Sequence, residues 1–152
     1  MVRDMEGPVF AFNGEECIQC HACEAACKSL RSPGRGVALR RVRKLWEGRY
    51  PDVRMITVSE SCMHCASPAC AAACPSGAIT KRPGDGIVAV DATLCTGCRN
   101  CHGACPIGAP QFGADGIMQK CDFCAGLGQP GGDPQCVRAC PTGALGVRDK
   151  NP

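Results

Sequence analysis

The stretch CTGCRNCHGACP, residues 95–106, contains four cysteines at the spacing C-x2-C-x2-C-x3-C, followed by proline. Spacers of two residues let a tight loop point three successive sulfurs toward three corners of one cube. The proline after the fourth cysteine favours a turn, because its ring restricts the backbone φ angle. This spacing is typical of thiolates that hold a cubane [4Fe-4S] cluster, with the fourth cysteine reaching a neighbouring cluster.

All 16 cysteines of the 152-residue chain fall into groups of four, and group one shares the spacing of the quoted group. Group one is Cys17, Cys20, Cys23 and Cys27; group two is Cys62, Cys65, Cys70 and Cys74; group three is Cys95, Cys98, Cys101 and Cys105; group four is Cys121, Cys124, Cys136 and Cys140. Groups two to four end in the related segments CPSGA, CPIGA and CPTGA, whereas group one ends in CKSLR. This internal repeat indicates that the groups are equivalent units.

The composition also favours a metal protein. A cysteine content this high is typical of a disulfide scaffold or a metal site. Only 4 Phe, 1 Trp and 1 Tyr are available to fill a core, while 19 Gly and 12 Pro indicate a chain rich in loops. Apolar burial alone would therefore stabilise the fold poorly, and we expect bound clusters to supply the missing cohesion.

The sequence shows no apolar stretch suited to export or to a membrane. Its first residues, MVRDMEGPVFAFNGEEC, contain no secretory signal, and no run of 18 apolar residues follows. We expect a cytoplasmic protein without a direct membrane span. Persistent disulfides are then not expected, because the cytosol keeps thiols reduced.

Between the cysteine groups, short alternating segments predict strands at 37–42, 53–58 and 87–91. Short helical turns are predicted within CEAACKSLR, PACAAAC and CHGAC, where residues three and four apart share one face. The expected fold class is α+β, with short helices and small antiparallel sheets or hairpins.

The spacing between groups suggests how they pair. Groups two and three are separated only by residues 75–94, which is short enough for each to give its fourth cysteine to the other. This pairing gives the Cys62 set (Cys62, Cys65, Cys70 and Cys105) and the Cys95 set (Cys95, Cys98, Cys101 and Cys74). Groups one and four then pair by default, giving the Cys17 set (Cys17, Cys20, Cys23 and Cys140) and the Cys121 set (Cys121, Cys124, Cys136 and Cys27). Spacing alone leaves a sequential pairing open.

A specific resemblance is carried by SCMHCASPACAAACPSGAITKRPGDGIVAVDATLCTGCRNCHGACPIGAPQFG, residues 61–113, and by the MQKCDFC that follows. The chain resembles the iron–sulfur subunit of the dimethyl sulfoxide reductase family over nearly its whole length, and residues 17–27 match that family's first motif. The resemblance implies two ferredoxin-like [4Fe-4S] dicluster modules with the nested pairing. It also implies four [4Fe-4S] clusters, because all sixteen ligand positions are cysteine.

Electron transfer is the function that the resemblance implies. The expected partners are a catalytic molybdenum or tungsten bis-pterin subunit and a further flavin, quinone or ferredoxin-linked carrier. An alternative is a free polyferredoxin, or a hydrogenase-linked or formate-linked electron carrier, and association of copies into a longer wire is a variant of it. Catalysis on the chain itself is not expected, because no CxxxCxxC run offers a cubane with an open iron.

We expect one four-cluster, ferredoxin-like domain over 1–152. Lobe one is expected over about residues 1–36 and 114–152, lobe two over about 59–113, and a basic hairpin over 37–58. From Lys28 to Arg54 the chain has nine Lys or Arg against Glu47 and Asp52, which indicates a solvated hairpin or a docking face for an acidic partner. Nucleic acid binding is not expected, because the interleaved aromatics are only Trp46 and Tyr50, and Trp46 is expected to pack.

Other metal sites explain less of the pattern. Zinc ribbons would use the CxxC pairs but not the third cysteine three residues on. CIQCH at 17–21 and CRNCH at 98–102 match the attachment motif of c-type haem, yet haem there would leave other cysteines without a role. His21, His64 and His102 are expected at the surface or beside the ligands, with a hydrogen bond to a cluster as the sharper alternative.

Overall fold

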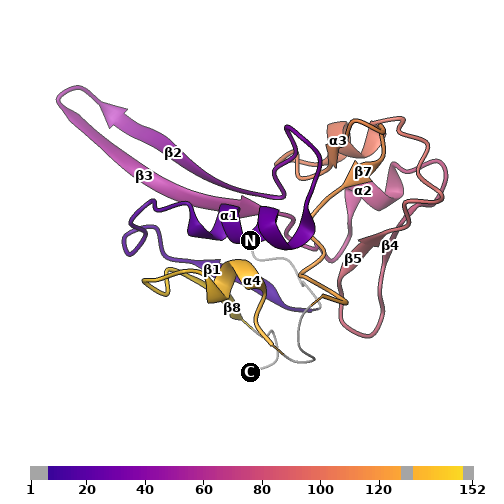
Figure 1. Cartoon of the computed structure of the whole chain (residues 1–152). Coiled ribbons are helices and arrows are strands. Elements are labelled where there is room, and N and C mark those ends of the chain that lie inside the picture. Colours follow the sequence, from indigo (N-terminus) through magenta and orange to yellow (C-terminus); the bar gives the residue numbers. More distant parts are fainter. Residues whose placement is uncertain (1–6, 128–131, 149–152) are drawn as a thin grey trace.

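Short helices and two-stranded sheets alternate along the chain in the computed structural model, which describes residues 7–127 and 132–148 (Figure 1). The helices are α1 (Ala22–Arg31), α2 (Ala69–Ala72), α3 (Asn100–Ala104) and α4 (Gln135–Arg138). The strands are β1 (Val9–Phe12), β2 (Arg40–Arg49), β3 (Asp52–Ser61), β4 (Ile79–Lys81), β5 (Val88–Val90), β6 (Gln111–Phe112), β7 (Met118–Gln119) and β8 (Leu145–Arg148). All pairings are antiparallel: β1 with β8, β2 with β3, β4 with β5, and β6 with β7. The predicted α+β class is confirmed.

The helices form where the spaced cysteines predicted them. Helix α1 covers CEAACKSLR and has good helix formers, with Glu24 in the first turn and Lys28 and Arg31 in the last. These charges stabilise the helix, because they complement its dipole. Helices α2 and α3 lie in PACAAAC and CHGAC and are only 4 and 5 residues long.

The hairpin β2–β3 projects from the rest of the described chain (Figure 1). Its strands are ten residues each and stay in register from Arg40 opposite Ser61 to Arg49 opposite Asp52. The predicted strand at 37–42 begins only at Arg40, because its partner strand β3 ends at Ser61, opposite Arg40. The prediction that Trp46 packs was wrong: this residue is 71% exposed.

Strands from the two ends of the described chain pair with each other. Strand β1 follows Pro8 and β8 follows Ala144, and their register sets Val9 opposite Arg148. Helix α1 contacts α4 in the same region, while α2 contacts α3 in the middle of the chain. Elements beside group one therefore lie against elements beside group four, and elements of group two lie against those of group three.

The apolar core is small. One buried cluster consists of Ile79, Val88, Cys101 and Met118, and two of its partly buried neighbours are Cys70 and Cys74. Cysteines thus take positions that larger apolar side chains fill in ordinary cores. Among the described residues, no helix combines the length and the hydropathy needed to span a membrane.

Candidate metal centres

Cysteines of groups two and three line one cavity. Its walls include Cys62, Cys65, Cys70 and Cys105, and its volume is about 140 Å³. Cys62 follows β3, Cys70 lies in α2 and Cys105 directly follows α3, so three segments converge on this space. The lining of this cavity thus includes the four thiols predicted for the Cys62 set.

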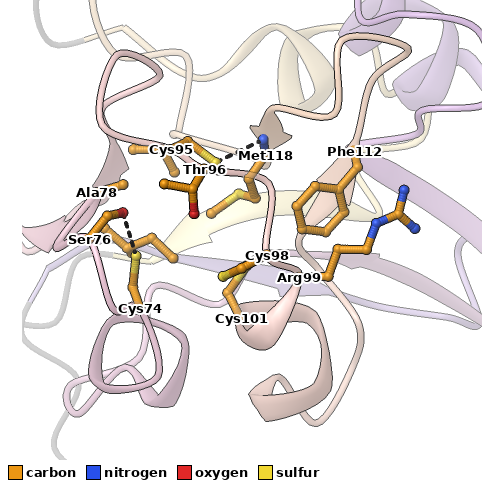
Figure 2. A pocket seen from close by; sticks show the side chains of 12 residues that line it. Cys74, Ser76, Ala78, Cys95, Thr96, Cys98, Arg99, Cys101, Phe112 and Met118 are labelled. Atoms are coloured by element: carbon orange, nitrogen blue, oxygen red, sulfur yellow. Dashed lines mark hydrogen bonds between the residues drawn. The ribbon is translucent and has the colours of Figure 1, made fainter.

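A second hollow is lined by Cys74, Cys95, Cys98 and Cys101 (Figure 2). Cys74 comes from the end of group two, and the other three come from group three. This hollow measures only about 10 Å³, so a bound cluster would have to hold it open. Its other walls include Met118 and Phe112, which belong to the core cluster or pack against it.

Groups one and four meet at Cys27. Burial raises the pKa of the Cys27 thiol to about 11, and the nearby thiols of Cys136 and Cys124 contribute in the same direction. Burial likewise raises the pKa of Cys121 to about 12, with smaller contributions from Cys62 and Cys136. The last cysteine of group one therefore lies near group four, and Cys121 lies near the cavity of the Cys62 set.

The residues of the Cys17 set lie beside the β1–β8 pair. Cys17 and exposed Cys20 precede α1, Cys23 lies in α1, and Cys140 precedes β8. The β1–β8 pairing and the contact of α1 with α4 hold these segments side by side. The structure thus places Cys140 in the region of group one, although 113 positions separate it from Cys27 in the numbering.

The closing segments CPSGA, CPIGA and CPTGA direct hydrogen bonds at their cysteine sulfurs. The Ser76 hydroxyl lies 3.5 Å from Cys74 Sγ, and the Thr142 hydroxyl lies 3.8 Å from Cys140 Sγ. At Cys105, where Ile107 replaces the hydroxyl residue, the Ala109 backbone N–H donates to the sulfur at 3.3 Å. Donors of this kind stabilise the thiolate, the form that binds iron.

The pKa values of the closing cysteines reflect these contacts. The Ser76 hydroxyl, the main cause, lowers the pKa of Cys74, with help from backbone N–H groups. Burial opposes ionisation at Cys140, yet the Leu145 backbone and the Thr142 side chain together lower its pKa. In contrast, burial dominates and raises the pKa of Cys70, Cys101 and Cys136. Binding iron at those three positions must expel protons from the thiols.

Two buried cations, Arg40 and Lys120, lie among the candidate ligands; the sequence predicted Arg40 as half of a surface pair with Arg41, which was wrong for Arg40, and it predicted nothing for Lys120. Arg40 is 2% exposed, donates to the hydroxyls of Ser59 and Ser61 at 2.9 Å each, and stacks over Phe10 at 4.1 Å. Its charge acts against the burial that raises the pKa of Cys136. Lys120 is 6% exposed and lines the cavity of the Cys62 set. A charge at either position should act strongly on the neighbouring cysteines, because burial limits screening by water.

His64 lies between Cys62 and Cys65 and is 3% exposed. Its Nδ1 accepts the backbone N–H of Val88 at 3.0 Å, and within residues 7–127 and 132–148 its buried Nε2 has no hydrogen-bond partner. Burial, assisted by the charges of Lys120 and Lys81, lowers the pKa of His64 to about 3. The ring is neutral with its proton on Nε2, and a buried donor without an acceptor costs about 1–3 kcal/mol. A cluster sulfur or a thiolate nearby would suit this donor.

The other two histidines have partners away from the sulfurs. The His21 ring lies 3.0 Å from Glu24 at the surface, and the His102 Nδ1 lies 2.8 Å from the carbonyl oxygen of Pro110.

Gly97, between Cys95 and Cys98, has a φ of +71°, and an added Cβ would lie 2.7 Å from the Gly116 carbonyl oxygen. That loop therefore requires glycine to bring its two cysteines together.

Two family descriptions match this chain. Residues 53–150 match the family described as "4Fe-4S dicluster domain", and residues 14–32 match "4Fe-4S binding domain". The two matched ranges include all sixteen cysteines.

Similar proteins come from several bacteria. The chain is 43% identical to "Probable anaerobic dimethyl sulfoxide reductase chain YnfG" of Escherichia coli strain K12, over 90% of this chain and 70% of that protein. It is 42% identical to a subunit of the anaerobic dimethyl sulfoxide reductase of Haemophilus influenzae, over 93% and 73%. It is 39% identical to "Formate dehydrogenase iron-sulfur subunit" of Wolinella succinogenes, over 89% and 78%.

Proposed function

The chain belongs to the 4Fe-4S dicluster family, and we propose accordingly that it relays single electrons between a catalytic molybdenum or tungsten bis-pterin subunit and another redox partner. It is an iron–sulfur electron-transfer subunit with four [4Fe-4S] clusters. When bound, these clusters supply one-electron chemistry. The names of its relatives, which are subunits of dimethyl sulfoxide reductase and formate dehydrogenase, support a catalytic partner.

One observation carries the proposed ligand sets. Cys105 belongs to group three in the sequence, yet it lines the same cavity as Cys62, Cys65 and Cys70. The reciprocal arrangement of Cys74 in the other hollow supports the same exchange. We therefore assign the four clusters to the Cys62, Cys95, Cys17 and Cys121 sets, with one cysteine of each set donated by the partner group.

The same contacts support two lobes and an order of clusters. The β1–β8 pairing supports a lobe one of about 1–36 and 114–152, and the α2–α3 contact supports a lobe two of about 59–113. The influence of Cys62 on Cys121 supports a junction between these lobes. We propose that electrons pass along the Cys17, Cys121, Cys62 and Cys95 sets, in either direction.

The role proposed for the chain itself is transfer without catalysis. Each proposed set supplies four thiolates, which leaves no iron open to a substrate. The chain's own residues hold the thiolates in place, donate hydrogen bonds to them and exclude water from the buried ones. We also propose a cytoplasmic location, because sixteen ligand thiols require a compartment that keeps them from forming disulfides.

Iron content tests the four clusters and the partner together. After anaerobic purification from its own cells, the chain should carry about 16 irons and copurify with a pterin-containing subunit. Stoichiometric zinc, or about half that iron, would contradict the cluster assignment. A monomer that is active without a pterin subunit would contradict the proposed partner and favour a free polyferredoxin.

Pairs of alanine variants test the nested ligands. Cys105→Ala and Cys62→Ala should each lose one cluster, about four irons, and the double variant should lose no more than either single one. Cys105→Ala combined with Cys95→Ala should lose about eight irons, because these two cysteines serve different clusters. Eight irons lost in the first double variant and four in the second would show instead that each group holds its own cluster, and eight lost in both would favour sequential pairing.

A further inference from the structure

Lys120 places a positive charge against one proposed cluster. It follows β7 directly, is 6% exposed, and lines the cavity that also contains Cys62, Cys65 and Cys70. Long cationic side chains normally keep their charged end in water. Burial of this one beside four candidate thiolates therefore needs an explanation.

Hydrogen bonds hold the ammonium group in place from both lobes. Its Nζ donates to the carbonyl oxygen of Val88 in β5 and, at 3.0 Å, to that of Cys121 in group four. Two fixed acceptors from separate segments restrict the position of the charge to the boundary between the Cys62 and Cys121 sets. The position does not depend on a flexible surface rotamer.

The charge of Lys120 lacks a carboxylate partner in the described part of the chain. The ion pairs found there join other residues, such as Arg31 with Asp122 and Arg82 with Asp85. A buried ammonium without a counter-ion is strongly unfavourable. The thiolates of a loaded Cys62 set would supply the missing negative charge. In agreement, Lys120 favours the thiolate of Cys70, although burial has the larger effect and raises the pKa of that residue.

We propose that Lys120 stabilises the reduced state of the cluster held by the Cys62 set and so raises its reduction potential relative to a neutral residue at this position. This inference rests on the proposed function. Adding an electron makes the site more negative, so a fixed cation nearby favours the reduced form, and the effect is large because little water screens it. The cluster of the Cys62 set, at the boundary between the two lobes, would then hold an electron more strongly than it would beside a neutral residue.

Two other cations, Lys81 and Arg40, help to identify which cluster Lys120 affects. Lys81 donates to the Cys65 carbonyl oxygen at 3.1 Å but is more exposed than Lys120, so water should weaken its effect on the same cluster. Arg40 acts on Cys136 and Cys121 of the neighbouring set. Removing the charge of Arg40 should therefore shift a different cluster from the one that Lys120 affects.

The test is a redox titration, followed by electron paramagnetic resonance, of the full-length loaded chain in its complex. In Lys120→Met and Lys120→Gln, the ratio of reduced to oxidised cluster at a fixed potential should fall at least tenfold for one cluster, a shift of about 59 mV for one electron. Lys120→Arg should keep a potential close to that of the unmodified chain. Lys81→Met should give a smaller shift of the same sign.

Controls separate charge from packing and from cluster loss. Each variant should keep about 16 irons, and the shift caused by Lys120→Met should disappear in a Cys105→Ala background that lacks the affected cluster. Unchanged potentials in both neutral variants would overturn the proposal, as would an equal shift in Lys120→Arg. If the unmodified chain itself lacks about 16 irons, the proposed function fails first.

Discussion

The cysteine sulfurs differ in whether a hydroxyl donor or a buried cation lies beside them. In CPSGA and CPTGA the residue two positions after cysteine is Ser76 or Thr142, whose hydroxyl reaches the sulfur. In CPIGA the same position is Ile107, and the Ala109 backbone N–H donates to Cys105 instead. Hydrogen bonds to sulfur favour the more negative reduced state of a cluster. The residue two positions after each closing cysteine therefore decides whether a hydroxyl group contributes to the reduction potential of that cluster.

Ser76→Ala should lower the reduction potential of the cluster assigned to the Cys95 set. The substitution removes the hydroxyl 3.5 Å from Cys74 Sγ, and the loss should correspond to about 1 kcal/mol. A redox titration of the loaded chain measures the shift. Thr80→Val is the control, because Thr80 is exposed on β4 and should leave all four potentials unchanged. Equal shifts in the two variants would show that the hydroxyl of Ser76 has no specific effect.

The β2–β3 hairpin presents two different faces. Residues directly opposite in an antiparallel pair lie on the same side, so Trp46, Met55 and Val53 share one face. Gln19 donates to the Thr57 hydroxyl of this face at 2.9 Å, beside Ile18, which is 63% exposed. This face, which also carries Lys44 opposite Thr57, thus extends from the hairpin to the loop of Cys17 and Cys20, where an electron-transfer partner would need to dock.

Trp46→Ser should weaken binding of the catalytic partner by about 2 kcal/mol or more, because exposed tryptophans often dominate interfaces. Tyr50→Ser is the matched control: Tyr50 is 94% exposed but lies in the turn, outside the shared face. Affinity can be measured by surface plasmon resonance with the isolated partner, and iron content should stay unchanged in both variants. A larger loss of affinity in Tyr50→Ser than in Trp46→Ser would exclude this face as the docking surface.

The whole molecule depends on its clusters for cohesion. Cysteines occupy or adjoin the core positions around Val88 and Met118, and the hollow of the Cys95 set is only about 10 Å³. The two-stranded sheets are marginal by themselves, because such hairpins are rarely stable in water. The contact of β1 with β8 should then rely on the ligands that groups one and four share.

Iron removal should therefore unfold most of the chain. Anaerobic chelation is expected to abolish the native circular dichroism and to make the chain sensitive to proteases, since the free energy of cluster binding is also that of folding. The loaded chain under the same conditions, without chelator, serves as the control. Cooperative thermal unfolding of an iron-free sample would contradict this expectation.

Local patterns in the sequence predicted much of the fold. The helices at α1, α2 and α3 follow from Ala and Cys spacing, and β3 and β5 follow from alternation. The pairing of β1 with β8 was not predicted, because each strand has only four residues and its partner lies at the other end of the chain. The exposure of Trp46 also escaped prediction, since an aromatic residue in a strand packs or projects according to what lies opposite.

Cysteine spacing along the chain is sufficient to identify the kind of cofactor and its number, because this information is largely local: in groups one to three, three thiolates lie within a few residues of one another. The surroundings of those ligands depend instead on how the chain folds. Folding brings Cys105 to the cavity of Cys62, buries Arg40 and Lys120 among the sulfurs, and leaves the Nε2 of His64 without an acceptor in the described residues. These features arise from contacts between segments that are distant in the sequence. Burial decides how strongly each charge acts on the cysteines, and the spacing of residues along the chain does not encode burial.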